Sequence, residues 1–163
     1  MCQSDNKSCG FCCPLTGFPL CPSKRFIKCF IVMLVWVNVF SWLWHSVVMG
    51  EMYQATASLW RGPDAMIGWS LYLGLALLAF FSAAIFLKGY EDAGCREGLR
   101  FGIIITLFFS GIGFITYATQ PIPGHIILYW ALGDLIMYSI GGMLMGAIAC
   151  GKGCCSKDAA SCA

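Results

Sequence analysis

Residues 124–150, GHIILYWALGDLIMYSIGGMLMGAIAC, decide the fold of this chain. The stretch is almost wholly apolar and exceeds the ~20 residues that an α-helix needs to cross a ~30 Å hydrocarbon core. Its interior holds no Lys or Arg and one acidic side chain, Asp134, which lies about 15 Å from the start of the helix and so close to the bilayer midplane. A carboxylate at that depth is costly unless it is neutral or paired, so Asp134 is the first candidate functional residue.

Composition places the chain among proteins that cross the membrane several times. Hydrophobic residues make up 59% of it and charged residues 11%, against about 25% charged in soluble domains, and its mean hydropathy is +0.76. We therefore expect an all-α membrane protein, a four-transmembrane-helix bundle that occupies residues 26–150. The expected spans are residues 26–48, 66–87, 101–118 and 124–149.

The basic residues predict the orientation of these spans. Arg61 alone lies in a loop on one side of the predicted bundle. The other basic residues lie in the two tails (residues 1–25 and 151–163), near the first span, or around the middle loop: Lys7, Lys24, Arg25, Lys28, Lys88, Arg96, Arg100, Lys152 and Lys157. Since short cytoplasmic loops carry the excess of Lys and Arg, we expect both termini in the cytoplasm. Basic residues confined to the membrane edges form no groove-sized surface, which argues against nucleic acid as a partner.

The eleven cysteines all fall on the predicted cytoplasmic side, where thiols stay reduced. We therefore expect free thiols, S-acylation sites or metal ligands in place of disulfides. Two clusters have spacings that suit a thiolate-bound Zn²⁺, Cu⁺ or iron–sulfur cluster. They are Cys9, Cys12 and Cys13 in the first tail, and Cys150, Cys154 and Cys155 at the start of the second.

Polar residues form stripes along the predicted spans and suggest partners for Asp134. Asn38 of the first span lies at similar depth, Tyr138 follows one turn later, and Thr106 and Ser110 of the third span are within reach. No Lys or Arg lies at that depth, so we expect a protonated, hydrogen-bonded Asp134. Three roles remain open for it: a structural hydrogen-bond node, a proton or cation site, and a contact with another subunit.

Small residues predict where helices approach each other closely. Gly102 and Gly113 share a face of the third span, and Gly142-x3-Gly146 is a small-xxx-small pair on the fourth.

A second group of residues predicts a metal site at the outer face. His45, His125, Glu51 and Asp64 have side chains that suit Zn²⁺ or Cu²⁺, although the two histidines have no fixed spacing.

Several short motifs carry a resemblance to other proteins. They are Tyr53 with Leu59-Trp60-Arg61, Lys88-Gly89-Tyr90-Glu91, the run from Glu97 to Gly102, and Pro121-Ile122-Pro123. Residues 40–148, which hold them, resemble a group of small four-span bacterial membrane proteins of unknown function. The resemblance implies the four-helix fold and the bacterial inner membrane, and it implies no chemistry.

No motif indicates catalysis. The chain lacks a Gly-rich phosphate loop before a helix, Gly-x-Ser-x-Gly and His-Glu-x-x-His, and its two histidines lie away from every thiol. We therefore expect no enzyme, but an accessory or interaction subunit that packs in the bilayer against a larger membrane complex or against itself. The alternative is a transporter or soft-metal handling protein that uses Asp134 and the cytoplasmic thiols.

Overall fold

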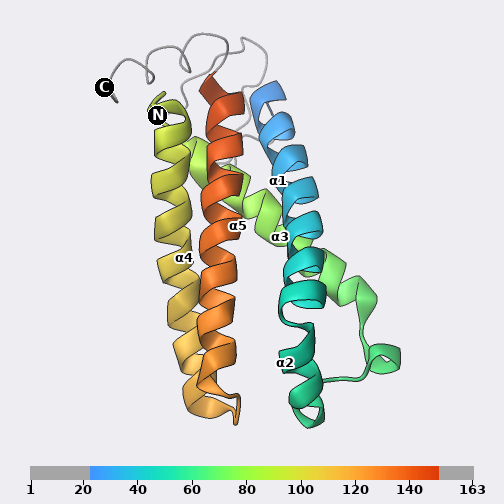
Figure 1. The fold of residues 1–163 in the computed structure, drawn as a ribbon. Coiled ribbons are helices and arrows are strands. Elements are labelled where there is room, and N and C mark those ends of the chain that lie inside the picture. The colour runs from blue at the N-terminus through green and yellow to red at the C-terminus, as the bar shows by residue number, and fades with distance from the viewer. Residues whose placement is uncertain (1–22, 151–163) are drawn as a thin grey trace.

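The computed structural model describes residues 23–150 and consists of helices and short turns (Figure 1). The described elements, in chain order, are α1 (Lys24–Leu43), the π-helical turn η1 (Trp44–Val48), α2 (Gly50–Ala55), the 3₁₀ turns η2 (Ala57–Leu59) and η3 (Pro63–Ala65), α3 (Gly68–Lys88), α4 (Gly94–Thr119) and α5 (Gly124–Cys150). Four helical segments, α1 with η1, α3, α4 and α5, are long and apolar enough to cross a membrane. The predicted all-α, four-span fold is confirmed.

The helix ends follow local capping chemistry. The Ser23 hydroxyl accepts a hydrogen bond from the Phe26 backbone N–H (3.1 Å) and so caps the start of α1. At the start of α4, the Glu97 carboxylate accepts hydrogen bonds from the backbone N–H groups of Glu91 (2.7 Å) and Ala93 (3.0 Å). These hydrogen bonds hold the backbone just before α4, which begins at Gly94. The predicted start was residue 101, because the prediction followed the apolar stretch and the helix extends beyond it into charged sequence.

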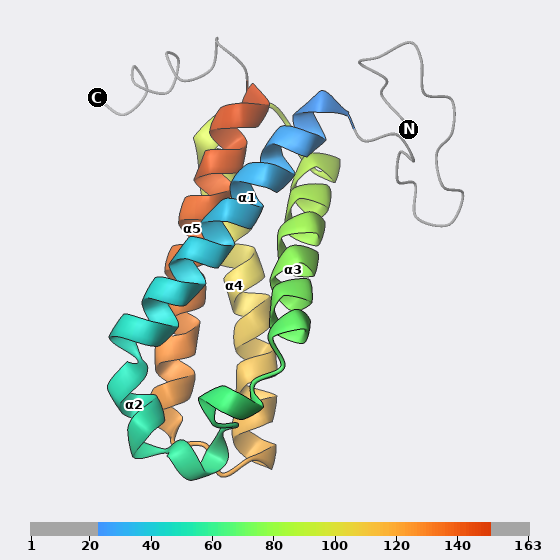
Figure 2. The ribbon, with the colours of Figure 1, turned by 90° about the vertical axis from the view of Figure 1, so that its right-hand side faces the viewer.

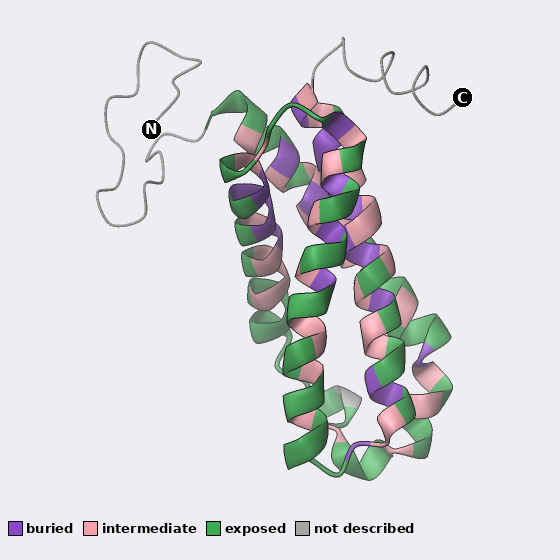
Figure 3. Ribbon diagram, turned by 90° about the vertical axis from the view of Figure 1, so that its left-hand side faces the viewer, coloured by how far each residue is buried: buried purple, intermediate pink, exposed green. Residues whose placement is uncertain are grey.

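The bundle has two different ends. The terminal end holds the start of α1, the connection between α3 and α4 (residues 89–93) and the end of α5; the loop end holds residues 49–67 and 120–123. Along the bundle α1 packs between α3 and α5, while α4 packs along α5 (Figures 1 and 2). Buried residues of α3 and α4 lie only in the halves nearer the terminal end, and the remainder of α4 is largely exposed (Figure 3).

Glycines let α4 and α5 touch backbone to backbone at the terminal end. A Cβ atom at Gly98 would collide with the carbonyl group of Gly142, and one at Gly146 would collide with that of Gly94. Gly102 lies equally close to the backbone of Tyr138. Such contacts join membrane helices through dispersion and weak Cα–H···O bonds, with no side chain between them.

The predicted packing residues divide accordingly. Gly102, Gly142 and Gly146 lie in this contact, as the sequence suggested, and Gly98 was missed. Gly113 takes no part in it: a Cβ there would make only an ordinary contact, 3.5 Å from Cγ2 of Ile127.

We predict that Gly98→Ala destabilises the bundle, because neither backbone can move away without opening the contact. The expected loss is about 1–3 kcal/mol in the free energy of unfolding in detergent, the range for overpacked cores. Gly111→Ala is the matched control on α4, since nothing lies within 4 Å of its added methyl group. The control should be neutral or slightly stabilising, as Ala favours helix over Gly. Equal stability of the two variants would show that the α4–α5 contact is not tight.

Candidate intramembrane binding site

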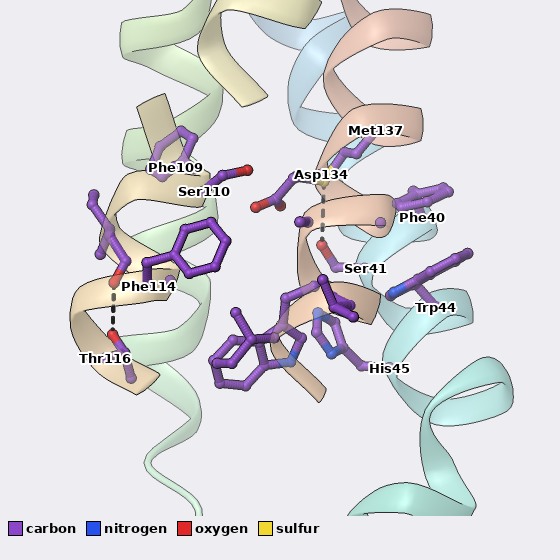
Figure 4. A pocket seen from close by; sticks show the side chains of 17 residues that line it. Phe40, Ser41, Trp44, His45, Phe109, Ser110, Phe114, Thr116, Asp134 and Met137 are labelled. Carbon is purple, nitrogen blue, oxygen red and sulfur yellow. Dashed lines mark hydrogen bonds between the residues drawn. The ribbon is translucent and has the colours of Figure 1, made fainter. Parts of the chain in front are cut away.

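Asp134 projects from α5 into a cavity of about 320 Å³ between α1 with η1, α4 and α5 (Figure 4). Its side chain is half-buried. The cavity is lined by Phe40, Ser41, Trp44, His45, Phe109, Ser110, Ile112, Gly113, Phe114, Thr116, Ile127, Leu128, Trp130, Ala131, Gly133, Asp134 and Met137. No residue of α3 lines it, so three of the four spans build the site.

The cavity exists because small side chains face each other where the bundle is loosely packed. Ser41 of α1, Ser110 and Gly113 of α4, and Ala131 of α5 leave space that larger residues would fill. On the terminal side the cavity is lined by Phe109, whose ring stacks on the Tyr138 ring with centroids 5.3 Å apart. The α4–α5 glycine contact lies beyond this stack and closes the bundle.

Within residues 23–150 the Asp134 carboxyl forms no hydrogen bond and no ion pair. Figure 4 shows it facing the cavity from α5, with the Ser110 hydroxyl facing the same space from α4. The described chain therefore brings Asp134 to a cavity and leaves its hydrogen-bonding capacity unused. An unpaired carboxyl in a low-dielectric interior is expected to be neutral, because the ionised form would be poorly solvated.

Three of the other predicted partners of Asp134 make their contacts elsewhere. The Asn38 side-chain amide donates to the Leu34 carbonyl (2.8 Å) and does not line the cavity. The Thr106 hydroxyl donates to the Gly102 carbonyl (2.9 Å), and Tyr138 is buried against Phe109. Polar side chains on a membrane helix readily bond to the carbonyl one turn before them, which removes the need for a partner on another helix. Of the predicted network, only Ser110 shares the cavity with Asp134.

The cavity has aromatic walls and a single acidic group. Its lining contains no Lys or Arg, and His45 is the other titratable residue in it. Phe109 and Phe114 come from α4, and Trp44 and Trp130 come from η1 and α5. The Trp44 indole N–H is buried against Gly133 and has no hydrogen-bond partner among the described residues. The site is thus apolar and electron-rich around one carboxyl.

An aromatic cluster lies at the loop end of the bundle, in contact with His45 and Trp130 of the cavity lining. The Tyr53 hydroxyl accepts a hydrogen bond from the Trp130 indole N–H (2.8 Å) and lies 2.7 Å from Nδ1 of His45. The Trp60 ring packs edge-on against both Tyr53 and Trp130, at 5.3 and 6.0 Å between centroids. Burial raises the pKa of Tyr53, and the hydrogen bond from Trp130 partly opposes that rise. These hydrogen bonds could not be predicted from the sequence, because they join α5 to a loop whose path the sequence does not reveal.

The predicted outer-face metal site does not form. Nδ1 of His45 is engaged with Tyr53, and the ring stacks on the Tyr53 ring. Among the described residues, which include His125, Glu51 and Asp64, no three His, Cys, Asp or Glu side chains come close enough to hold a metal ion.

The thiol predictions fall mostly outside the described residues, where Cys9, Cys12, Cys13, Cys154 and Cys155 lie. Cys150 ends α5 and is the one member of the two cysteine clusters among the described residues, so both clusters stay predictions. Cys29 and Cys95 carry no disulfide.

Comparison of the chain with protein-family models, curated proteins and solved structures finds no match. The resemblance to small four-span bacterial proteins therefore stays a prediction, and function must be argued from the site.

We predict that Tyr53→Phe loosens the loop end. The change leaves the Trp130 indole N–H and His45 without their shared partner, which should lower the free energy of unfolding by about 1–3 kcal/mol. Tyr72→Phe is the control, because Tyr72 is 66% exposed on α3. Unfolding in detergent, followed by tryptophan fluorescence, measures both variants. Equal stability of Tyr53→Phe and the control would show that the Tyr53 hydroxyl does not stabilise this cluster.

Proposed function

We propose that this multi-pass integral membrane protein is a non-catalytic accessory or interaction protein that binds a group from outside the chain at Asp134. Four apolar helices support the membrane location. The single observation that carries the proposal is the Asp134 carboxyl, which faces a cavity at mid-span and has no partner within the described residues.

The missing partner is informative because of where the carboxyl lies. A carboxyl near the bilayer midplane that serves the fold is expected to be hydrogen-bonded across helices. Two of the candidate donors on neighbouring helices, Asn38 and Thr106, bond to their own backbones instead, and Ser110 faces the cavity without a hydrogen bond to Asp134 among the described residues. Placing an acid at this depth costs free energy. A partner that arrives from the membrane explains this cost better than a structural role within the bundle does.

The packing on the terminal side of the cavity favours binding over transport. A transporter or soft-metal handling protein needs a path from Asp134 to the thiols at that end. The Phe109–Tyr138 stack and the α4–α5 glycine contact occupy the way, and Met33 and Met145 are fully buried beside them. These contacts support a site that is closed at one end.

A non-catalytic role is supported by the hydrogen bonds of the cavity residues. A nucleophile needs a base within hydrogen-bond reach. The Ser41 hydroxyl points instead to the Met137 sulfur (3.7 Å), and Nδ1 of His45 is held by Tyr53 (2.7 Å).

We further propose a bacterial inner-membrane location with the terminal end in the cytoplasm. The described basic residues support it: Lys24, Arg25, Lys28, Lys88, Arg96 and Arg100 lie at or near the terminal end, and Arg61 lies at the loop end. The partner is then a component of the same bilayer, either a larger membrane complex or a second copy of the chain.

A hydrophobic carbodiimide tests whether Asp134 is a neutral acid that the bilayer can reach. In a dry site, a protonated carboxyl adds to dicyclohexylcarbodiimide, and the O-acylisourea formed rearranges to a stable N-acylurea. We expect the protein in lipid nanodiscs to gain one adduct, located on Asp134 by peptide mass spectrometry and absent from Asp134→Asn.

Carboxylates in water provide the control for this experiment. Glu51 and Glu91 are exposed and should react with a water-soluble carbodiimide instead of the hydrophobic one. If Asp134 in the folded protein stays unmodified by the hydrophobic reagent, the proposed binding site is closed or its carboxyl is already engaged, and the proposal fails.

A further inference from the structure

We propose that the Asp134 cavity binds a lipophilic organic cation that enters from the bilayer. The inference rests on the proposed function, because it names the chemical class of the group that Asp134 receives.

Charge selects the class of ligand. Asp134 is the only acidic group in the lining, and no Lys or Arg faces it from α1, η1, α4 or α5. An anion would find no counter-charge in this cavity, and a neutral molecule would leave the carboxyl as an unpaired acid. A cation converts the same carboxyl into half of an ion pair, which is the complementary state in a low-dielectric site.

The walls select an organic cation over a metal ion. Phe109, Phe114, Trp44 and Trp130 line the cavity, and aromatic faces attract alkylammonium and similar soft cations through their quadrupoles. A metal ion would need several strong ligands, and no three His, Cys, Asp or Glu side chains come close enough to hold one among the described residues.

Size and access select a ligand that dissolves in lipid. The volume of about 320 Å³ lies at the lower end of the ~300–1,000 Å³ range of small-molecule sites. α1 and α4 each pack on α5 but hardly touch each other, so the cavity between them is not sealed by a helix–helix contact. The surrounding helix surfaces are apolar, with Val39 and Phe114 more than half exposed, so a ligand that enters here passes through hydrocarbon.

Binding a permanently charged cation requires the carboxyl to release its proton. The empty site holds a neutral Asp134, and the occupied site holds a carboxylate beside the cation, so one proton leaves to water for each cation bound. The other titratable groups near Asp134 are His45 on η1, which lines the same cavity, and Tyr138, one turn further along α5. Affinity should therefore rise by up to about tenfold per pH unit while the empty site is protonated.

The test uses tetraphenylphosphonium and the full chain in lipid nanodiscs. Equilibrium dialysis should show saturable binding of one cation per chain, tighter at higher pH, with proton release measured in weak buffer. Asp134→Asn should lose at least about tenfold in affinity, the loss expected when a buried ion pair loses one charge. Asp134→Glu keeps the charge and should retain binding. This variant shows that a loss of binding in Asp134→Asn comes from the lost charge and not from misfolding.

Substitutions of two phenylalanines on α4 distinguish binding in the cavity from simple partitioning of the cation into lipid. Phe114 lines the cavity, and Phe108 does not, although their side chains are similarly exposed at 61% and 66%. Phe114→Leu should weaken binding, and Phe108→Leu should leave it unchanged. Equal effects of the two changes, or unchanged binding in Asp134→Asn, would overturn the inference.

Protection from the hydrophobic carbodiimide separates this inference from the proposed function. Tetraphenylphosphonium should protect Asp134 from modification, whereas its neutral analogue tetraphenylsilane should not. Suppose that Asp134 is modified and that either the neutral analogue alone or neither compound protects it. A cation is then the wrong class of ligand, and the proposed binding site at Asp134 still stands. If Asp134 is never modified, the proposed function fails first.

Discussion

The backbone contact between α4 and α5 is the constraint on which the rest of the structure depends. Gly94 and Gly98 on α4 meet Gly146 and Gly142 on α5, and Gly102 meets the backbone of Tyr138, with no side chain between them. In a bilayer, where lipid is as apolar as the protein core, such close approach is one of the few means of holding two helices together. α1 then packs on the other side of α5, where the Trp36 indole N–H donates to the Met137 carbonyl (2.8 Å).

Tight packing at the terminal end has a consequence at the loop end. There α3 buries no residue, α4 is largely exposed, and a separate cluster of Met49, Ile122, Ile126 and Ile127 fastens the loop to α5. The hydrogen bonds of Tyr53 reinforce this second attachment. The cavity lies between the glycine contact at the terminal end and this cluster at the loop end. The site therefore results from the packing of the whole bundle and not from one sequence motif.

Much of the architecture could be predicted from sequence, because each span is a long apolar run and the loops between the spans are short. The glycine contact was partly predictable: Gly142-x3-Gly146 was recognised, while the equally regular Gly94-x3-Gly98-x3-Gly102 was only represented by Gly102. Helical periodicity also placed Asp134 on an inward face. It could not tell whether Asn38 would reach across to Asp134 or bond to its own backbone, since both outcomes leave Asn38 on the same face.

The cavity itself was beyond prediction for a related reason. Ser41, Ser110 and Ala131 are ordinary small residues in three different helices, and only their arrival at one level makes a space. The hydrogen bond between Trp130 and Tyr53 joins positions far apart in the chain, and hydropathy does not register such pairs.

The most direct test of this account is difference infrared spectroscopy of the protein in lipid, wild type against Asp134→Asn, in the carbonyl-stretch region of carboxylic acids. A neutral Asp134 without a hydrogen-bond partner predicts a band at the high-frequency limit for carboxylic acids that is lost in the variant. A carboxylate band, or an acid band shifted down by strong hydrogen bonding, would show that the chain itself satisfies Asp134 and would contradict a site that awaits a partner.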